Sequence, residues 1–245
     1  MREPRIYTEQ PLHSGRPLTL EAEPSRHLLK VLRLRPGDPL LLFNGDGREF
    51  HARLAAATKD SATVDLGEVG RNERPAVLDI TLFIGVSRGE RMDFAVQKAV
   101  ELGATRIVPL FARRSVVQLK GERLERRLDH WRGVMIGACE QSGRCRLPLL
   151  ETASDLSEAV AGNGQGLRLV LHHQGSAALP DLPPPKSGVD LLIGPEGGLE
   201  ASEIALARDH GFIPVRLGPR IMRTETAPIA ALAAIQTLWG DFRGG

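Results

Sequence analysis

The feature that most constrains the fold is a regular alternation of strand and helix patterns from Asp79 onward. Short apolar runs such as "DITLFIGV" (79–86), "RIVPLF" (106–111) and "VDLLI" (189–193) are typical of strands. Longer amphipathic stretches such as "RMDFAVQKAVELG" (91–103) separate them. Strands that alternate with helices predict a mostly parallel sheet with helices on both faces, so we expect an α/β domain here.

The first 73 residues follow a different pattern of short alternating apolar segments. "PLLLF" (39–43), "NGDG" (44–47) and "REFHARLAAAT" (48–58) predict a hairpin, because Asn-Gly and Asp-Gly tolerate the positive φ of tight turns. One helical stretch, "PSRHLLKVLR" (24–33), lies among the predicted strands. The polar segment "GRNERPA" (70–76) is typical of a linker. We therefore expect a small β-barrel or sandwich at residues 1–73 and the α/β domain at residues 74–245.

Composition narrows the class of protein. No run of roughly 18 uncharged apolar residues occurs, and the start of the chain has no apolar core typical of a signal peptide, so we expect a cytoplasmic protein with no membrane segment. The net charge is only +2, yet the 32 Lys and Arg residues gather in clusters. These clusters, which favour either a phosphate-binding surface or a solvated face, are "RHLLKVLRLR" (26–35), "SRGER" (87–91), "ARRS" (112–115) and "SGRCR" (142–146).

The cysteines and the paired histidines do not predict a metal site. Cys139 and Cys145 match no zinc or redox spacing, so we interpret them as reduced thiols. His172 and His173 are adjacent and would point to opposite faces of a strand, which favours a structural or solvent-facing role for both.

Two glycine-containing segments indicate a ligand pocket. "LLIGPEGGLEASE" (191–203) is an apolar run, a glycine-rich loop and a helix start, and on its own it could be a plain turn. Glu196 in its middle makes phosphate a poor ligand and favours a neutral or cationic one. About twenty residues later "VRLGPRIMRTETAPIAALAAIQ" (215–236) repeats the arrangement. Loops that follow neighbouring strands of an open α/β sheet would form one pocket.

These two segments closely resemble the RsmE-type uridine-N3 methyltransferases of small-subunit (16S) ribosomal RNA, which belong to the SPOUT class. "HLLKVLRLRPGD" (27–38), "KAVELGATRIVPL" (98–110) and "EQSGRCRLP" (140–148) extend the resemblance over nearly the whole chain. The resemblance implies an RNA-binding PUA-like β-barrel, a parallel sheet with a deep trefoil knot, a homodimer, and S-adenosylmethionine as the cofactor. Its implied cofactor contacts are Leu171, Ile193, Gly194, Pro195, Glu196, Gly197, Leu217, Gly218, Ile221, Met222, Thr224, Thr226 and Ala227.

The segment between the second turn and the last helix holds the candidate catalytic residues. We assign Arg223 to the negative charge that develops on the base and Glu225 to the proton of uridine N3. Glu225 could instead be an acid favoured at a helix start, where Thr224 or Thr226 could supply the cap and Pro228 fits the first turn.

Arginines and a lysine are the candidate RNA contacts. Arg26, Lys30 and Arg33 recur at helical spacing, with a solvated helix face as the alternative. The other candidates are Arg88, Arg91, Arg113, Arg114 and Arg144. The apolar helix "PIAALAAIQTLW" (228–239) could pack against a second copy of the chain or inside one copy. Two functional alternatives stay open: a ribose 2′-O-methyltransferase of the same knotted class and a catalytically silent RNA-binding factor.

Overall fold

The computed structural model describes residues 3–162, 164 and 166–243, so the outermost residues of the two predicted domains, 1–2 and 244–245, lie outside it. The chain forms two compact units. One is Met1–Pro75 with Ile136–Leu147, and the other is Ala76–Met135 with Pro148–Gly245. The segment 136–147 thus packs with the first unit, although a single boundary after residue 73 would assign it to the second.

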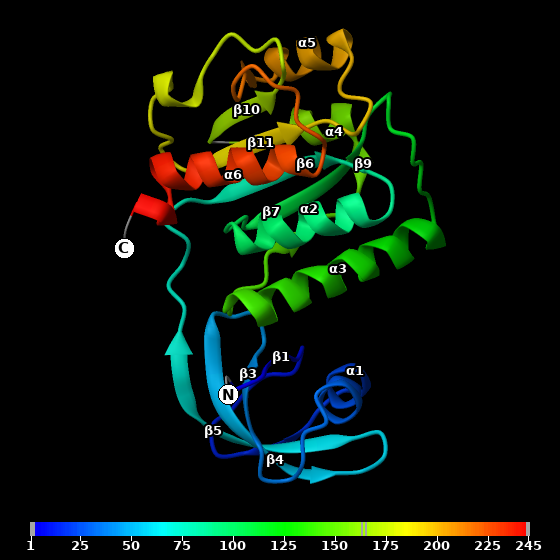
Figure 1. Ribbon diagram of the computed structural model, residues 1–245, viewed down its shortest axis with the longest axis vertical. Helices are drawn as coiled ribbons and strands as arrows, with labels where there is room; N and C mark the ends of the chain where they lie inside the picture. The colour runs from blue at the N-terminus through cyan, green and yellow to red at the C-terminus, as the bar shows by residue number, and fades with distance from the viewer. Residues whose placement is uncertain (1–2, 163, 165, 244–245) are drawn as a thin grey trace. The chain divides into compact units, whose positions relative to one another are not determined.

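The first unit is built on a five-stranded sheet, drawn in blue and cyan in Figure 1. Its strand order is β1-β3-β4-β5-β2, and only β1 and β3 are parallel. The predicted hairpin is confirmed, since β3 and β4 pair antiparallel on either side of residues 44–47. The strands are β1 (Arg5–Tyr7), β2 (Pro17–Thr19), β3 (Pro39–Phe43), β4 (Arg48–Ala57) and β5 (Ala62–Asn72).

The predicted helix at 24–33 begins and ends two residues earlier than expected. It consists of α1 (Ala22–Arg26) and one wide π-helical turn, η1 (His27–Val31). The N–H of Leu34 donates to the carbonyl of Leu28 (3.0 Å), and both side chains pack in the core of this unit. Because that burial turns the chain, Arg33 leaves the helix with a φ of +57°, and the predicted helical spacing of Arg33 with Arg26 and Lys30 is wrong.

A buried arginine fastens the segment 136–147 to this sheet. The Arg5 guanidinium donates to Glu49 Oε2 (2.5 Å) and to the carbonyls of Glu140 (3.1 Å) and Arg144 (3.0 Å). Arg5 and Glu49 are each 7% exposed. The guanidinium therefore binds carbonyl groups at the end of α3 (Glu122–Ser142), where a positive charge is favourable.

The two cysteines are free and buried, which confirms the interpretation as reduced thiols. Burial raises the pKa of Cys139 to about 12. Burial, with the charge of Glu49 adding to it, also raises the pKa of Cys145. Neither thiol is therefore a reactive group at neutral pH.

The second unit is a parallel sheet, as predicted. Its order is β12-β10-β11-β6-β7-β8, with β9 paired to β7, and the pairings between its strands are parallel. The strands are β6 (Ile80–Gly85), β7 (Arg106–Phe111), β8 (Leu149–Leu150), β9 (Ser154–Asp155), β10 (Leu167–Leu171), β11 (Val189–Ile193) and β12 (Ile213–Val215).

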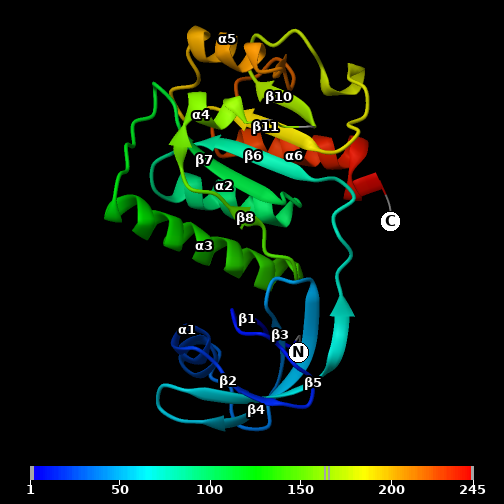
Figure 2. The ribbon, with the colours of Figure 1, turned by 180° about the vertical axis from the view of Figure 1, so that it is seen from behind.

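Helices cover both faces of this sheet, which confirms the α/β prediction. Figures 1 and 2 show α2 (Glu90–Glu101) and α6 (Thr226–Trp239) on one face, and α4 (Leu156–Ala161) and α5 (Ala201–Asp209) on the other. Short 3-10 helices are η2 (Leu179–Asp181) and η3 (Asp241–Arg243). None of the helices in the described part of the chain is long and apolar enough to cross a membrane. The trefoil knot stays a prediction.

The start of α6 differs from the expected cap. Glu225 is the N-cap residue in place of Thr224 or Thr226, and its side chain makes no capping hydrogen bond. The N–H groups of Thr226 and Ala227 donate to the carbonyl of Arg223, so a tight backbone turn begins the helix. Pro228 lies in the first turn, as predicted.

Candidate active site

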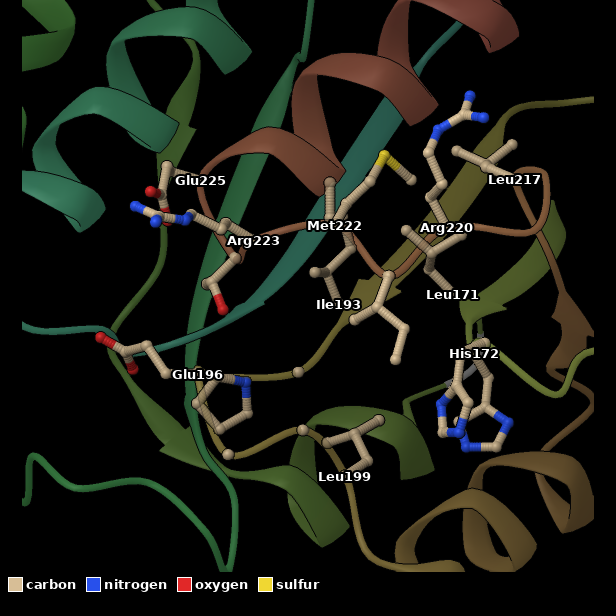
Figure 3. Close-up of a pocket in the computed structure, with 18 of the residues that line it drawn as sticks. Leu171, His172, Ile193, Glu196, Leu199, Leu217, Arg220, Met222, Arg223 and Glu225 are labelled. Carbon is tan, nitrogen blue, oxygen red and sulfur yellow. The ribbon is translucent and has the colours of Figure 1, made fainter.

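The two glycine loops lie at one cavity, here called the loop cavity, at the carboxyl ends of β10, β11 and β12 (Figure 3). It has a volume of about 450 Å³. In an open parallel sheet the carboxyl ends of adjacent strands bring their loops together, which is where such sheets bind small molecules. The sequence prediction that both loops belong to one pocket agrees with this geometry.

Most predicted cofactor contacts line this cavity, together with Arg223 and Glu225. Thr226 is not part of the lining, because it begins α6 with an exposed side chain. The lining residues that were predicted are Leu171, Ile193, Gly194, Pro195, Glu196, Gly197, Leu217, Gly218, Ile221, Met222, Thr224 and Ala227. The lining residues that sequence reasoning missed are His172, His173, Leu199, Arg216 and Arg220.

The first loop packs closely against the loop that follows β7. A Cβ atom added at Gly197 would lie 2.7 Å from Cβ of Arg114 and 2.9 Å from its carbonyl oxygen. Arg114 Nη1 in turn donates to the carbonyl of Gly197 (3.3 Å). The missing side chain of Gly197, one of the expected cofactor contacts, makes room for Arg114, so this glycine sets the position of the cavity wall.

Glu203 fixes the same two loops from the other side. Its Oε1 accepts the N–H of Arg113 (2.8 Å), and its Oε2 accepts the N–H of Glu200 (2.8 Å) in a capping box that starts α5. The guanidinium of Arg113 lies 3.6 Å from Glu200. Arg113 is therefore held beside the first loop and does not line the cavity.

Glu196 points out of the apolar part of the loop cavity. Its Oε1 accepts the N–H of Arg88 (3.0 Å) and a guanidinium N–H of Arg91 (3.4 Å). Burial favours a raised pKa for this carboxyl, but the Arg88 N–H, other hydrogen bonds and the Arg91 charge together lower its pKa. Figure 3 shows the carboxylate turned away from Leu171 and Met222. The hydrogen bonds of this carboxylate to Arg88 and Arg91 thus connect the first loop to the start of α2.

The second loop carries the candidate catalytic side chains. Gly218 begins it with a φ of +73°, and a Cβ atom there would meet nothing within 4 Å. Figure 3 shows Arg223 and Glu225 together on the side of the cavity next to α2, whereas Ile193 and Met222 form an apolar side. The hydrogen-bond donor Arg223 and the acceptor Glu225 therefore lie beside an apolar wall that suits an uncharged part of a ligand.

The histidine pair contradicts its predicted arrangement. Because β10 ends at Leu171, strand alternation does not reach His172 and His173, and their ring centroids lie 4.6 Å apart. Both residues line the loop cavity. Burial, the neighbouring His173 and Arg208 lower the pKa of His172, which keeps its imidazole neutral at physiological pH.

The predicted RNA contacts divide between the two units. Arg88, Arg91, Arg113 and Arg114 surround the first loop, and Arg91 and Arg114 line the cavity. In the other unit, Arg26, Lys30 and Arg33 are exposed, and Lys30 pairs with Asp60 at 3.0 Å. Arg144 also belongs to that unit, where its carbonyl binds Arg5.

The residues of the loop cavity fit S-adenosylmethionine. Gly198 and Gly218 both line the cavity, and a Cβ atom at either would project into open space. This leaves main-chain groups accessible beside the apolar side chains of Leu171 and Ile193. The volume is within the range of small-molecule sites. Within the described ranges, no group of three or more His, Cys, Asp or Glu residues could hold a metal ion.

Comparison with known families defines the class as a two-domain RNA methyltransferase. Residues 73–236 match the family model for an RNA methyltransferase domain, and residues 20–67 match an RNA methyltransferase PUA domain. The chain is 31% identical to ribosomal RNA small subunit methyltransferase E of Buchnera aphidicola, over 98% of this chain and 95% of that protein. It is 30% identical to the protein of the same name from Bacillus subtilis, over 93% of each chain.

Similar solved structures also come from methyltransferases, including one with the same name as these relatives. Ribosomal RNA small subunit methyltransferase E from Neisseria gonorrhoeae, bound to S-adenosylmethionine, superposes with a TM-score of 0.92 at 39% identity, covering 98% of this chain and all of that one. A methyltransferase of Legionella pneumophila, also solved with S-adenosylmethionine, gives a TM-score of 0.95 at 40% identity with the same coverage. This chain belongs to the ribosomal RNA small subunit methyltransferase E family, as its motifs indicate.

Proposed function

We propose that this chain transfers a methyl group from S-adenosylmethionine to N3 of one uridine in small-subunit ribosomal RNA. Methylation of ribosomal RNA with this cofactor is the activity of the family to which the chain belongs. The choice of N3 is supported by one observation in particular. A guanidinium, Arg223, and a carboxylate, Glu225, line the same cavity as the two glycine loops.

The chemistry at N3 requires these two kinds of group. Uridine N3 carries a proton at neutral pH and is a nucleophile only after that proton is removed, which leaves negative charge on O2 and O4. Bound S-adenosylmethionine would supply a methyl group on a sulfonium, which is a good leaving group. The protein then has to orient the base, accept its proton and stabilise the charge.

Each residue has one role in this proposal. Glu225 accepts the proton of N3, directly or through water, and Arg223 stabilises the negative charge on the uracil oxygens. Leu171, Ile193 and Met222 and the main chain of both loops hold the cofactor. The helix-start explanation for Glu225 stays open, because Glu225 is the N-cap residue of α6, where a negative charge is favourable even without a capping hydrogen bond.

Substitution of the two residues tests these roles. Glu225→Gln keeps the shape of the side chain and should slow methylation by orders of magnitude, and Arg223→Ala should slow it as well. An effect confined to the helix dipole would cost only a few tenths of a kcal/mol to about 1 kcal/mol of stability. The product is read as a reverse-transcription stop, since N3 lies on the pairing edge of the base.

Cofactor binding is the control for both variants and is measured by calorimetry. If both variants bind S-adenosylmethionine normally and give the stop at the wild-type rate, the assigned roles are wrong. A methyl group on a ribose oxygen would favour the 2′-O-methyltransferase alternative. A wild-type chain that does not bind the cofactor would favour the silent RNA-binding factor.

The proposal extends to partners and architecture. The RNA is bound within the small ribosomal subunit of the cytoplasm by a PUA-like domain at residues 1–73 and a knotted domain at residues 74–245. Exposed arginines around the first loop, such as Arg88 and Arg91, contact its phosphates. The chain acts as a homodimer in which α6 packs against its counterpart. Sedimentation that gives a monomer at micromolar concentration would contradict the dimer.

A further inference from the structure

A second cavity, here called the α2 cavity, borders the loop cavity. It has a volume of about 520 Å³ and is lined along α2 by Arg91, Phe94 and Gln97, with Val134 of α3 and Glu225 completing the wall. Arg91 and Glu225 line both cavities. Figure 3 shows Glu225 beside α2 at the edge of the loop cavity. Glu225 therefore lies at the boundary of the two cavities, where it could contact ligands bound in either one.

The apolar part of the α2 cavity suits a flat ring. The Phe94 side chain is 43% exposed, which is high for a large apolar residue, and Val134 lies near it in the same wall. The Lys98 ammonium lies 5.7 Å from the Phe94 ring centroid. Exposed aromatic rings are the surfaces on which proteins stack bases that have been turned out of an RNA strand.

The polar part of the α2 cavity matches the pairing edge of uracil. That edge presents an acceptor at O2, a donor at N3 and an acceptor at O4. The cavity offers N–H donors from Arg91 and Gln97 and an acceptor from Glu225. The ion pair of Arg91 with Glu196 (3.4 Å) restrains the guanidinium. Cytosine has a lone pair at N3, which a carboxylate would repel, so this set of groups favours uracil over cytosine.

The remaining acids of the α2 cavity do not change this match. Oδ2 of Asp93 lies 2.8 Å from Nε2 of His130, which holds this side chain toward α3, whereas its Oδ1 is buried without a hydrogen-bond partner. Glu90 is exposed at the start of α2, where an acid is favourable.

We propose that the α2 cavity is the subsite for the target base, with uracil stacked on Phe94 and its pairing edge bound by Arg91, Glu225 and Gln97. This inference rests on the proposed function and adds the residues that select the base. In this arrangement N3 faces Glu225 at the boundary of the two cavities, which is where a methyl group held in the loop cavity has to reach it.

Binding of two matched RNA fragments tests the subsite. One fragment contains the target uridine in its unmethylated form and the other has cytidine in its place, and both are titrated into the full chain with S-adenosylhomocysteine present. The wild-type protein should prefer the uridine RNA. Gln97→Leu removes one hydrogen bond and should weaken that RNA about 3- to 10-fold, with no change for the cytidine RNA. Glu225→Gln replaces a carboxylate oxygen, which repels the N3 lone pair of cytosine, with an amide NH₂ group. This variant should therefore discriminate less between the uridine RNA and the cytidine RNA.

Two controls separate the subsite from other effects. Gln118→Leu is the same substitution at an exposed residue outside both cavities and should leave both affinities unchanged. Affinity for S-adenosylmethionine, measured by calorimetry, should be unchanged by Gln97→Leu. Equal binding of both RNAs by the wild-type protein, or equal effects of Gln97→Leu and Gln118→Leu, would overturn the subsite.

The outcomes also distinguish the subsite from the proposed function. If N3-methyluridine forms and Gln97→Leu has no effect on RNA binding, the subsite alone fails. If the base preference behaves as expected and the methyl group is found on a ribose, the assignment of N3 fails. If Phe94→Ala changes the sedimentation of the protein and leaves RNA binding intact, the α2 cavity belongs to a subunit contact and the subsite is wrong.

Discussion

Replacing Gly197 with alanine should damage both the fold and the cofactor site. The added Cβ atom would lie 2.7 Å from Cβ of Arg114 and 2.9 Å from its carbonyl oxygen, whereas favourable contacts between carbon atoms need about 3.5–4.0 Å. Neither atom of Arg114 can rotate away, so one of the two loops has to move. Overpacking of this kind costs about 1–3 kcal/mol of unfolding free energy. A displaced first loop should also weaken S-adenosylmethionine binding by at least about tenfold, or 1.4 kcal/mol.

The assay pairs denaturant unfolding with calorimetric titration of the cofactor. Gly133→Ala is the matched control, because a Cβ atom there meets nothing within 4 Å and the residue is inside α3. That control should keep wild-type affinity and gain up to about 1 kcal/mol of stability, since alanine is the better helix former. Wild-type affinity and wild-type unfolding in Gly197→Ala would refute the reasoning that this glycine sets the cavity wall.

Further predictions concern single residues in both units. Gly218→Val forces a φ of +73° on a branched residue, so cofactor affinity should fall while the first loop keeps its contacts; unchanged titration curves would contradict this. Arg5→Leu leaves Glu49 buried without its partner and should cost about 3–5 kcal/mol in denaturant unfolding. Cys139, with a pKa of about 12, should resist alkylation at pH 8 until the protein unfolds, and rapid labelling of the folded chain would show otherwise. The Glu196 carboxyl has a lowered pKa, so its stabilising contribution is present above the usual pKa and is lost as pH falls through the folded value; Glu196→Gln should flatten that acid limb of the stability profile.

The strands and helices of this chain could be predicted because their periodicity is local. Apolar runs such as 106–111 and 189–193 became strands with the predicted limits, and the parallel order of the sheet follows from their alternation with helices. The glycines in the loops that follow β11 and β12 were sufficient to predict that these two loops form a ligand pocket. These features depend on residues that are near one another in the sequence.

Long-range packing could not be predicted in the same way. Arg33 leaves its helix because Leu28 and the partly buried Leu34 pack in the same core on either side of the turn, which no periodicity in that segment indicates. His172 and His173 reach the loop cavity because β10 ends at Leu171, two residues before the end of the strand on which both were expected to lie. The contact of Gly197 with Arg114 joins residues 83 positions apart.

The identity of the methylated atom tests the central claim most directly. Small ribosomal subunits that lack the modification are incubated with the wild-type chain and labelled S-adenosylmethionine, and the RNA is digested to nucleosides for mass spectrometry. The proposed function predicts label in N3-methyluridine at a single position, which coincides with the reverse-transcription stop. Label in a 2′-O-methylated nucleoside, or no transfer to RNA by a chain that binds the cofactor, would contradict it.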